Sequence, residues 1–194
     1  GIRLPDVAVP LATYTGWNPI MSGNGASAER IPAIQVGDGY FKVMKAEPML
    51  GRVFTADEQQ EGKDFVIVLG YGLWRRRFGS DPAIVGKKVL LNSRPYTVVG
   101  VMGPDFRALP STLVMPEGQF YRPVAEPYND KKRSERHLRA IARLRPGVTT
   151  QQAQTETSLI AQRLEQQHPE TNKGRGVHIT SITEDTVGGA SRAL

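Results

Sequence analysis

Apolar and polar residues alternate along several short stretches of the chain, and this period of two predicts β-strands. The stretches at 87–91 and 96–102 flank a short polar segment, 92–95, and predict a hairpin. Pro32 indicates an edge position or a bulge in the strand that contains it. The expected strands are residues 29–36, 65–69, 87–91, 96–102, 137–144 and 177–183.

Apolar residues three or four positions apart predict two amphipathic helices. The first follows Gly70 and ends at Gly79, a residue type that favours helix C-termini. The second begins after Thr149, whose spacing from Gln152 is that of a capping box, and ends near His168. The residues expected in the core of the fold are Tyr71, Trp74, Phe78, Val98, Leu138 and Leu164.

Two shorter helices are predicted from capping residues in the first third of the chain. Asp38 is placed to cap a helix at 40–44, and Thr55 with Glu58 has the form of a capping box. Strands and helices therefore mix without a simple repeat, which indicates an α+β fold. The strand–helix–strand order over 137–183 predicts a parallel pairing there.

Composition indicates a globular protein with room for one domain or two small ones. The 194 residues are 39% hydrophobic and 23% charged, which excludes disordered, collagen-like and coiled-coil chains. The longest apolar run, 65–69, is far shorter than the roughly 18 residues of a membrane span. The first residues lack a signal-peptide pattern, and we expect the chain to be a fragment of a longer protein.

Charge favours neither a nucleic acid nor a lipid partner by itself. The net charge is +6, and its two dense groups, 75–77 and 131–133, are each interpreted as solvated surface. A nucleic-acid-binding sheet needs aromatic residues between basic ones on exposed strands. Here the aromatic residues lie mainly on the helix at 71–78, where they are expected in the core.

No motif for catalysis, cofactor binding or metal binding is found. The chain has no cysteine, and its three histidines, His137, His168 and His178, have no spacing typical of metal ligands. Neither a serine nucleophile elbow nor a glycine-rich phosphate loop occurs. The carboxylates are scattered, so no acid–base pair is predicted and the chain is not expected to be an enzyme.

Several longer strings nevertheless resemble one family. Residues 39–58, 66–87 and 91–102, followed by 142–149 and 168–172, are similar in order and content to the MacB-like periplasmic core domain of bacterial ABC-transporter permeases. The resemblance is strongest to the large permeases that carry this domain twice. It departs at Ser93, where the family has glycine. It also departs at 120–124, where the family has Leu-Trp-x-Pro-Leu and this chain has Phe-Tyr-Arg-Pro-Val after an apparent insertion near 110–118. The serine predicts a different turn within the same fold.

The resemblance implies a two-lobed α+β domain outside the cytoplasmic membrane. A membrane-proximal, porter-like lobe of strand–helix–strand units would contain residues 1–60 and 137–194, and an inserted, sabre-like lobe of mixed strands and helices would contain 61–136. In the family the domain lies between the first two transmembrane helices of the permease. No catalytic residue or cofactor is implied for this chain, since ATP binds a separate cytoplasmic ATPase.

The function that the resemblance implies is mechanical: motion of the transmembrane helices, driven by the ATPase, would reach substrate export or an envelope partner. The implied partners are that ATPase, a second permease copy or duplicated domain, and an envelope protein or exported substrate. Alternatives are an envelope module that regulates a cell-wall enzyme or handles lipoprotein and, more weakly, an autonomous envelope enzyme or nucleic-acid binder. The candidate partner contacts are Phe120, Tyr121, Lys131, Lys132 and Arg133.

Overall fold

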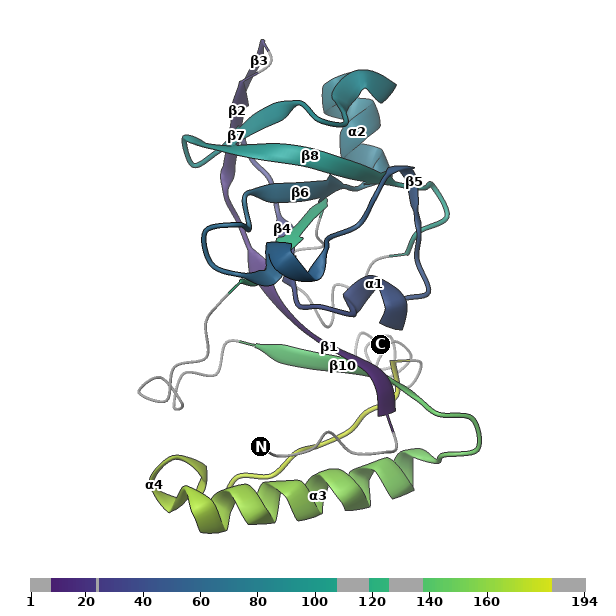
Figure 1. Cartoon of the computed structure of the whole chain (residues 1–194), viewed down its shortest axis with the longest axis vertical. Coiled ribbons are helices and arrows are strands. Elements are labelled where there is room, and N and C mark those ends of the chain that lie inside the picture. The colour runs from purple at the N-terminus through teal and green to yellow at the C-terminus, as the bar shows by residue number, and fades with distance from the viewer. Residues whose placement is uncertain (1–7, 24, 108–118, 126–137, 183–194) are drawn as a thin grey trace, which may run out of the picture. The chain divides into compact units, whose positions relative to one another are not determined.

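A computed structural model describes residues 8–23, 25–107, 119–125 and 138–182 as a sheet-dominated α+β fold (Figure 1). The ten strands follow the order β10-β1-β4-β9-β6-β8-β7-β2-β3, and β5 also pairs with β8. The strands are β1 (Ala8–Trp17), β2 (Ile20–Gly23), β3 (Ala26–Arg30), β4 (Ala33–Val36), β5 (Pro48–Gly51), β6 (Val66–Leu69), β7 (Lys88–Leu91), β8 (Arg94–Met102), β9 (Phe120–Pro123) and β10 (Arg139–Leu144). The helices are α1 (Tyr40–Val43), α2 (Tyr71–Phe78), α3 (Thr150–Gln167) and α4 (Pro169–Asn172), with 3₁₀ turns at Ala56–Gln59 and Pro82–Ile84.

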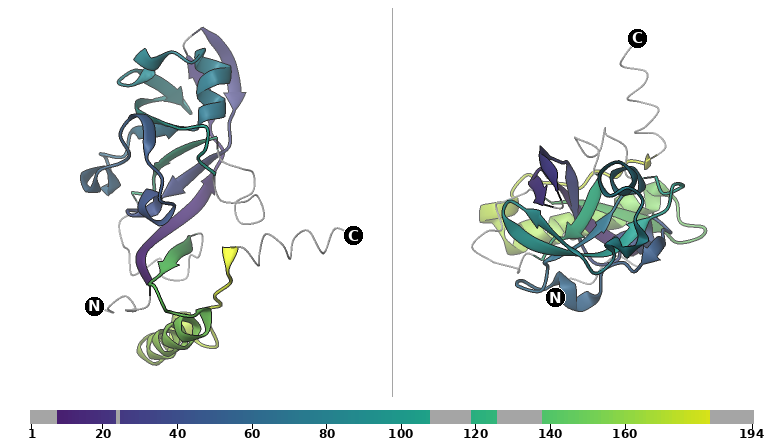
Figure 2. Two further views of the ribbon diagram at one scale, coloured as in Figure 1. Left: turned by 90° about the vertical axis from the view of Figure 1, so that its right-hand side faces the viewer. Right: turned by 90° about the horizontal axis from the view of Figure 1, so that it is seen from above.

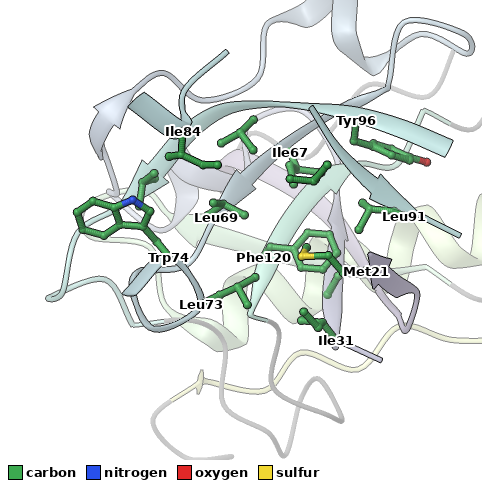
Figure 3. Close-up of a cluster of buried hydrophobic side chains, with 14 residues drawn as sticks. Met21, Ile31, Ile67, Leu69, Leu73, Trp74, Ile84, Leu91, Tyr96 and Phe120 are labelled. Carbon is green, nitrogen blue, oxygen red and sulfur yellow. The ribbon is translucent and has the colours of Figure 1, made fainter. Parts of the chain in front are cut away.

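Successive strand residues point to opposite faces of the sheet, and a core cluster lies on each face. One core cluster contains Tyr14, Ile34, Val68 and Tyr121, and lies with α1. The second contains residues of β6, β8 and β9 packed against α2, and Figure 3 shows its side chains converging between these elements. Val98, Ile67 and Phe120 in this second cluster are all fully buried.

Pro32 ends a strand where the alternating pattern predicted one continuous element. The expected strand at 29–36 is two strands, β3 and β4, separated by Ile31 and Pro32. Proline has no backbone N–H, so it cannot donate to a ladder of strand hydrogen bonds. The two strands therefore take different neighbours: β3 pairs with β2, and β4 lies between β1 and β9.

The hairpin of β7 and β8 has a two-residue turn, shorter than the predicted four residues. Leu91 pairs with Arg94, which leaves Asn92 and Ser93 as the loop. Their φ angles are 48° and 64°, and two positive values are the requirement of a type I′ turn. The expectation of a different turn was wrong, because Asn92 and Ser93 form the type I′ turn that an Asn-Gly pair favours.

The strand β10 buries the opposite face from the one predicted. Leu138 precedes the strand and is 40% exposed, and Ala140 and Ala142 are exposed as well. Ile141 is the buried residue, and it joins the cluster of Tyr14 and Val68. Leu138 is therefore not a core residue: a shift of one position exchanges the faces of a strand.

The helix α2 has the predicted limits and the predicted aromatic face. Gly70 precedes it and Gly79 ends it with a positive φ of 60°. Trp74 is buried, and its indole N–H donates to the carbonyl of Asp81 at 2.9 Å. Tyr71 and Phe78 are half-buried and pack at the edge of the same cluster.

Local capping signals formed as predicted at two places and failed at one, and Asp81 forms a further cap. The capping boxes of Thr55 with Glu58 and of Thr149 with Gln152 are present, and Asp81 accepts from the N–H of Ala83 at 2.8 Å. Asp38 does not cap α1; its carboxylate accepts from Gly39, which is the residue at the cap position.

Contacts divide the described residues into two compact units. One contains residues 8–11 and 142–182, and the other contains 12–23, 25–107, 119–125 and 138–141. The expected lobes, 1–60 with 137–194 against 61–136, follow a different division and stay a prediction. In the structure β5 pairs with β8 and β4 with β9, so residues 33–51 contact residues on the far side of position 61.

The smaller unit is built around α3, which is seen nearly end-on in the left view of Figure 2. Ala153 is its fully buried centre, with Leu144, Val148 and Ile179 packed against it. Leu164 is half-buried and lies outside this cluster. Of the strand predicted at 177–183, residues 177–182 are described and none of them is in a strand, so the parallel strand–helix–strand unit is not formed among the described residues.

Candidate functional site

A groove of about 510 Å³ lies where α2 begins, beside the end of β8 and the start of β9. Its aromatic lining comes from Tyr71, Phe106 and Tyr121. Gly70 closes one wall by approaching the chain before β9: its N–H donates to the carbonyl of Gln119 at 2.9 Å, and a Cβ at this glycine would lie 2.6 Å from that oxygen. The described lining residues are Gly70, Tyr71, Gly72, Leu73, Arg76, Gly103, Pro104, Phe106, Gln119 and Tyr121.

The groove has a mixed polar and apolar lining and lacks the side chains of acid–base chemistry. No carboxylate, histidine or serine side chain is present among the described residues that line it. Its one cation, Arg76, is already engaged: it donates to both carboxylate oxygens of Glu29, at 2.8 and 2.9 Å, and to the side-chain oxygen of Gln119 at 3.0 Å. The cation of the groove is therefore already paired within the chain.

The arginines at 75–77 are not one solvated group, contrary to the prediction. The Arg77 side chain is only 5% exposed and donates to the backbone oxygens of Met21 and Ser27. Arg76 and Arg77 both contact Glu29, so they attach α2 to the hairpin of β2 and β3. Arg75 alone is free of these ties and stacks over Tyr71 at 5.7 Å.

A second charged site lies at the other end of β9. The Arg122 guanidinium pairs with the carboxylate of Asp64, and the two side chains are 13% and 11% exposed. The same guanidinium lies 4.9 Å from the ring centre of Trp17 and 5.5 Å from that of Tyr96. Stacking on aromatic faces suits the planar guanidinium and keeps water from the ion pair.

This site also changes the acidity of Tyr96. Burial raises the pKa of its phenol above the ordinary value of 10, and Asp64 acts in the same direction while Arg122 opposes it. Phe65 extends the aromatic row, with its ring 5.4 Å from that of Tyr96 and the exposed Arg94 stacked over it at 5.0 Å. The arrangement joins β1, β8 and β9.

Phe120 and Tyr121 were predicted to contact a partner, and this prediction is wrong because both side chains are buried. Their side chains are 0% and 1% exposed, because β9 lies between β4 and β6 and each ring enters one of the two cores. Lys131, Lys132 and Arg133 lie outside the described residues. The remaining sequence candidates, Tyr71, Trp74, Phe78 and Val98, are parts of the core that positions the groove.

Sequence reasoning missed the pair of Asp64 and Arg122. The available signal was a charged residue inside an apolar string, 120–124, together with a carboxylate directly before the apolar run 65–69. A charge in a buried strand needs a partner of opposite sign. No spacing rule identified which one, since 58 positions separate the two residues.

The described residues offer neither a metal-binding cluster nor a membrane-spanning helix. Among the described residues, no three histidine, aspartate or glutamate side chains gather closely enough to hold a metal ion. Within the same ranges, no helix combines the length and apolar character that crossing a bilayer requires.

Known sequences and folds relate the chain to one group of proteins. The profile of the MacB-like periplasmic core domain family matches residues 2–158. The periplasmic region of MacB from Actinobacillus actinomycetemcomitans has a TM-score of 0.65 and 19% identity, over 98% of this chain and 78% of that one. No curated protein sequence matches this chain.

Two further solved structures have the same fold. The extracellular domain of the noncanonic ABC-type transporter YknZ from Gram-positive bacteria has a TM-score of 0.60 and 16% identity, over 89% of this chain and 83% of that one. A domain of a putative permease protein from Porphyromonas gingivalis has a TM-score of 0.59 and 12% identity, over 94% and 81%. At these identities the likeness concerns the fold alone.

Proposed function

The chain belongs to the MacB-like periplasmic core domain family, and from this premise we propose that it relays ATPase-driven motion of a permease's transmembrane helices to substrate export or to envelope partners. As a MacB-like periplasmic core domain, the chain is part of an ABC-transporter permease. The relay, its non-catalytic character and its specific partners are our proposal. The family match over residues 2–158 is the observation that carries it.

The packing of the larger unit supports a mechanical role. A relay needs elements that move as rigid bodies, because a soft element absorbs the displacement that it receives. Here the central strands are covered on both faces, with Ile67, Val68, Val98 and Val101 each fully buried. Ion pairs join separate elements, as Arg76 and Arg77 do for α2 and β3.

The groove fits this role as a contact surface. Its aromatic and glycine lining and its engaged arginine suit a packing partner rather than a substrate that must react. We propose that an envelope partner or exported molecule contacts the groove and that ATP binds a separate cytoplasmic subunit.

The experiment uses the full-length permease together with its ATPase. This chain contributes no cysteine, so a single engineered thiol reports its own position. Glu61→Cys is at an exposed residue and should react with a membrane-impermeant maleimide added outside the cytoplasmic membrane. Val98→Cys, at a fully buried residue, is the matched control and should react only after unfolding.

The relay itself is tested by nucleotide. We expect the labelling rate of a second exposed thiol, Gln166→Cys on α3, to differ between the ATP-bound and nucleotide-free complex. Labelling of Glu61→Cys from the cytoplasm alone would overturn the location. Rates at Gln166→Cys that are the same in both nucleotide states would overturn the relay.

A further inference from the structure

The outward face of α3 carries few charges for an exposed helix surface. The helix buries Ala153 and Ala161, and at 3.6 residues per turn Leu159 lies on the side away from both. All of α3 is described, and Arg163 is the one exposed residue of it that has a charged side chain. The exposed residues are Thr150, Gln151, Gln152, Thr155, Leu159, Gln162, Arg163, Gln166 and Gln167. This composition favours a contact surface, because charged residues are depleted where two protein surfaces meet.

A stripe of four residues runs along the middle of this face of α3, the long green helix in Figure 1: Thr155, Leu159, Gln162 and Gln166. They follow one another at intervals of four, three and four residues, which keeps them on one side of a helix. The same intervals form the seam between two packed helices. Leu159 is 49% exposed and is the apolar member of the stripe. The stripe therefore has the spacing of a helix–helix contact with a single apolar anchor.

Two opposite charges flank Leu159 on the same side of the stripe. Glu156 lies three residues before it and Arg163 four residues after it, and a separation of seven residues returns nearly to the same angle on a helix. Along the helix the two are about 10 Å apart, whereas ion pairs within a helix join residues three or four positions apart. No ion pair joins either of them to another described residue. Each charge therefore lacks a partner within the described chain.

An antiparallel second copy of α3 complements this pattern of charges. When the two helices cross at Leu159, a residue that precedes Leu159 in one copy faces a residue that follows it by about the same distance in the other. Glu156 of each copy then meets Arg163 of the other copy, because both lie on the same side of the stripe. In a parallel pair each charge would meet its own equivalent, and like charges in contact are unfavourable.

The remaining residues of the stripe are self-complementary in the same arrangement. Thr155 of one copy faces Gln162 of the other, and Leu159 faces its own equivalent at the two-fold axis. A glutamine amide both donates and accepts hydrogen bonds, so it meets a hydroxyl without repulsion. A two-fold contact uses the same surface on both copies, as this one does. A lipid surface fits less well, since helices that lie on membranes carry a broad apolar face and many basic residues.

We infer that the face of α3 centred on Leu159 is an interface with a second copy of this chain, in which the two helices pack antiparallel about a two-fold axis. One apolar anchor per copy makes the contact weak and reversible. Such a contact suits subunits that a membrane already holds together, because tethering raises their effective concentration. The inference goes beyond the proposed relay and does not depend on it.

The arrangement is tested by thiol cross-linking in the full-length permease with its ATPase, free of other cysteines, with and without ATP. Leu159→Cys places two thiols beside the axis, and a short bis-maleimide should join two copies. Gln166→Cys on the same stripe is the matched control. Antiparallel helices hold its two thiols about 21 Å apart along the axis, beyond the reach of the reagent. In a parallel pair both variants would cross-link equally.

The charges are tested by a swap in the Leu159→Cys background. Glu156→Arg makes both intermolecular pairs repulsive and should lower the cross-linked fraction by about fivefold. The double variant, Glu156→Arg with Arg163→Glu, restores opposite charges and should recover the fraction of Leu159→Cys alone, which a misfolded helix would not do. Glu61→Arg makes the same change of charge at an exposed residue of the larger unit and should leave the fraction unchanged.

Cross-linking at Leu159→Cys and not at Gln166→Cys, in either nucleotide state, supports the antiparallel contact. Equal cross-linking at both positions, or none at either position in both nucleotide states, would overturn it. A fraction that Glu156→Arg leaves unchanged would also overturn it, as would cross-linking of Leu159→Cys to a different protein in place of a second copy. The relay is judged separately, from the ATP dependence of labelling at Gln166→Cys.

Discussion

Ser93 carries a conformational cost that one substitution removes. A non-glycine residue in the left-handed region costs about 1–2 kcal/mol, and its φ is 64°. We predict that Ser93→Gly raises the free energy of unfolding by about 0.5–1 kcal/mol, after allowing for the greater freedom of glycine in the unfolded chain. Urea unfolding measures this. Lys88→Gly, at an exposed residue of β7 whose pairing with β8 is unbroken, is the control and should lower stability; a loss at both positions would contradict the turn described.

Arg122 and Asp64 are predicted to stabilise the sheet mainly by remaining paired. Removing one partner leaves a charge that is largely shielded from water, so Asp64→Ala should cost about 3 kcal/mol of unfolding free energy. The nearby pair of Lys63 and Asp57 has side chains that are 55% and 74% exposed, and Asp57→Ala should cost about 0.5 kcal/mol or less. Equal losses in chemical denaturation would show that burial does not set the value of these pairs.

Among the elements, the 3₁₀ turn at Ala56–Gln59 links stability to pH. Arg52 donates two hydrogen bonds to the Glu58 carboxylate, at 2.8 and 2.7 Å, and this contact lowers the pKa of Glu58 below its ordinary value of 4.5. The folded state thus favours the charged form. Its contribution is complete above pH 4.5 and is lost as the pH falls through the lower folded value.

We therefore predict that Glu58→Gln reduces the fall in stability between about pH 5 and pH 3. Urea midpoints across this range provide the measurement. Glu61→Gln, at an exposed carboxylate, is the matched control. The same acid dependence in wild type and Glu58→Gln would show that the ion pair contributes nothing to the pH response.

Strand β9 is predicted to contribute to the free energy of unfolding rather than to partner binding. Phe120 is fully buried between β4 and β6, so Phe120→Ala should cost about 3–5 kcal/mol. Leu90→Ala, at a residue of β7 that is 38% exposed, should cost about 0.5 kcal/mol. Thermal unfolding of the two variants separates these outcomes; a stable, fully folded Phe120→Ala would return this residue to the candidate contacts.

At the scale of the whole molecule, the described residues of the two units differ in how much apolar surface they bury. The larger unit holds both core clusters, whereas one buried residue, Ala153, centres the smaller one. Local stability follows such burial, so α3 should open at a lower free energy than β6 and β8. Amide exchange should be faster in α3 than in these strands.

Val98→Ala tests whether the units open separately. The substitution removes two methyl groups from a fully buried site and should cost the larger unit about 2 kcal/mol. Exchange of β6 and β8 amides should accelerate, whereas that of α3 should stay the same. Equal acceleration of both sets would mean that the molecule unfolds as one cooperative unit.

The sequence by itself determined the features that depend on neighbours a few residues apart. The capping boxes at Thr55 and Thr149, the limits of α2 and the hairpin of β7 and β8 follow from residue type and spacing, because the contacting groups are close along the chain. The ordered family strings likewise indicated the family and its α+β fold.

Only the tertiary structure decided which faces are buried and which distant residues meet. Ala33 pairs with Phe120, Arg122 with Asp64, and Gln154 with the backbone of Val177 and Ile179. A string such as 120–123 reads the same whether it forms an exposed loop or a central strand, because burial depends on what lies on either side. Long-range pairing supplied those neighbours, and it moved Phe120 and Tyr121 into the core and Leu138 out of it.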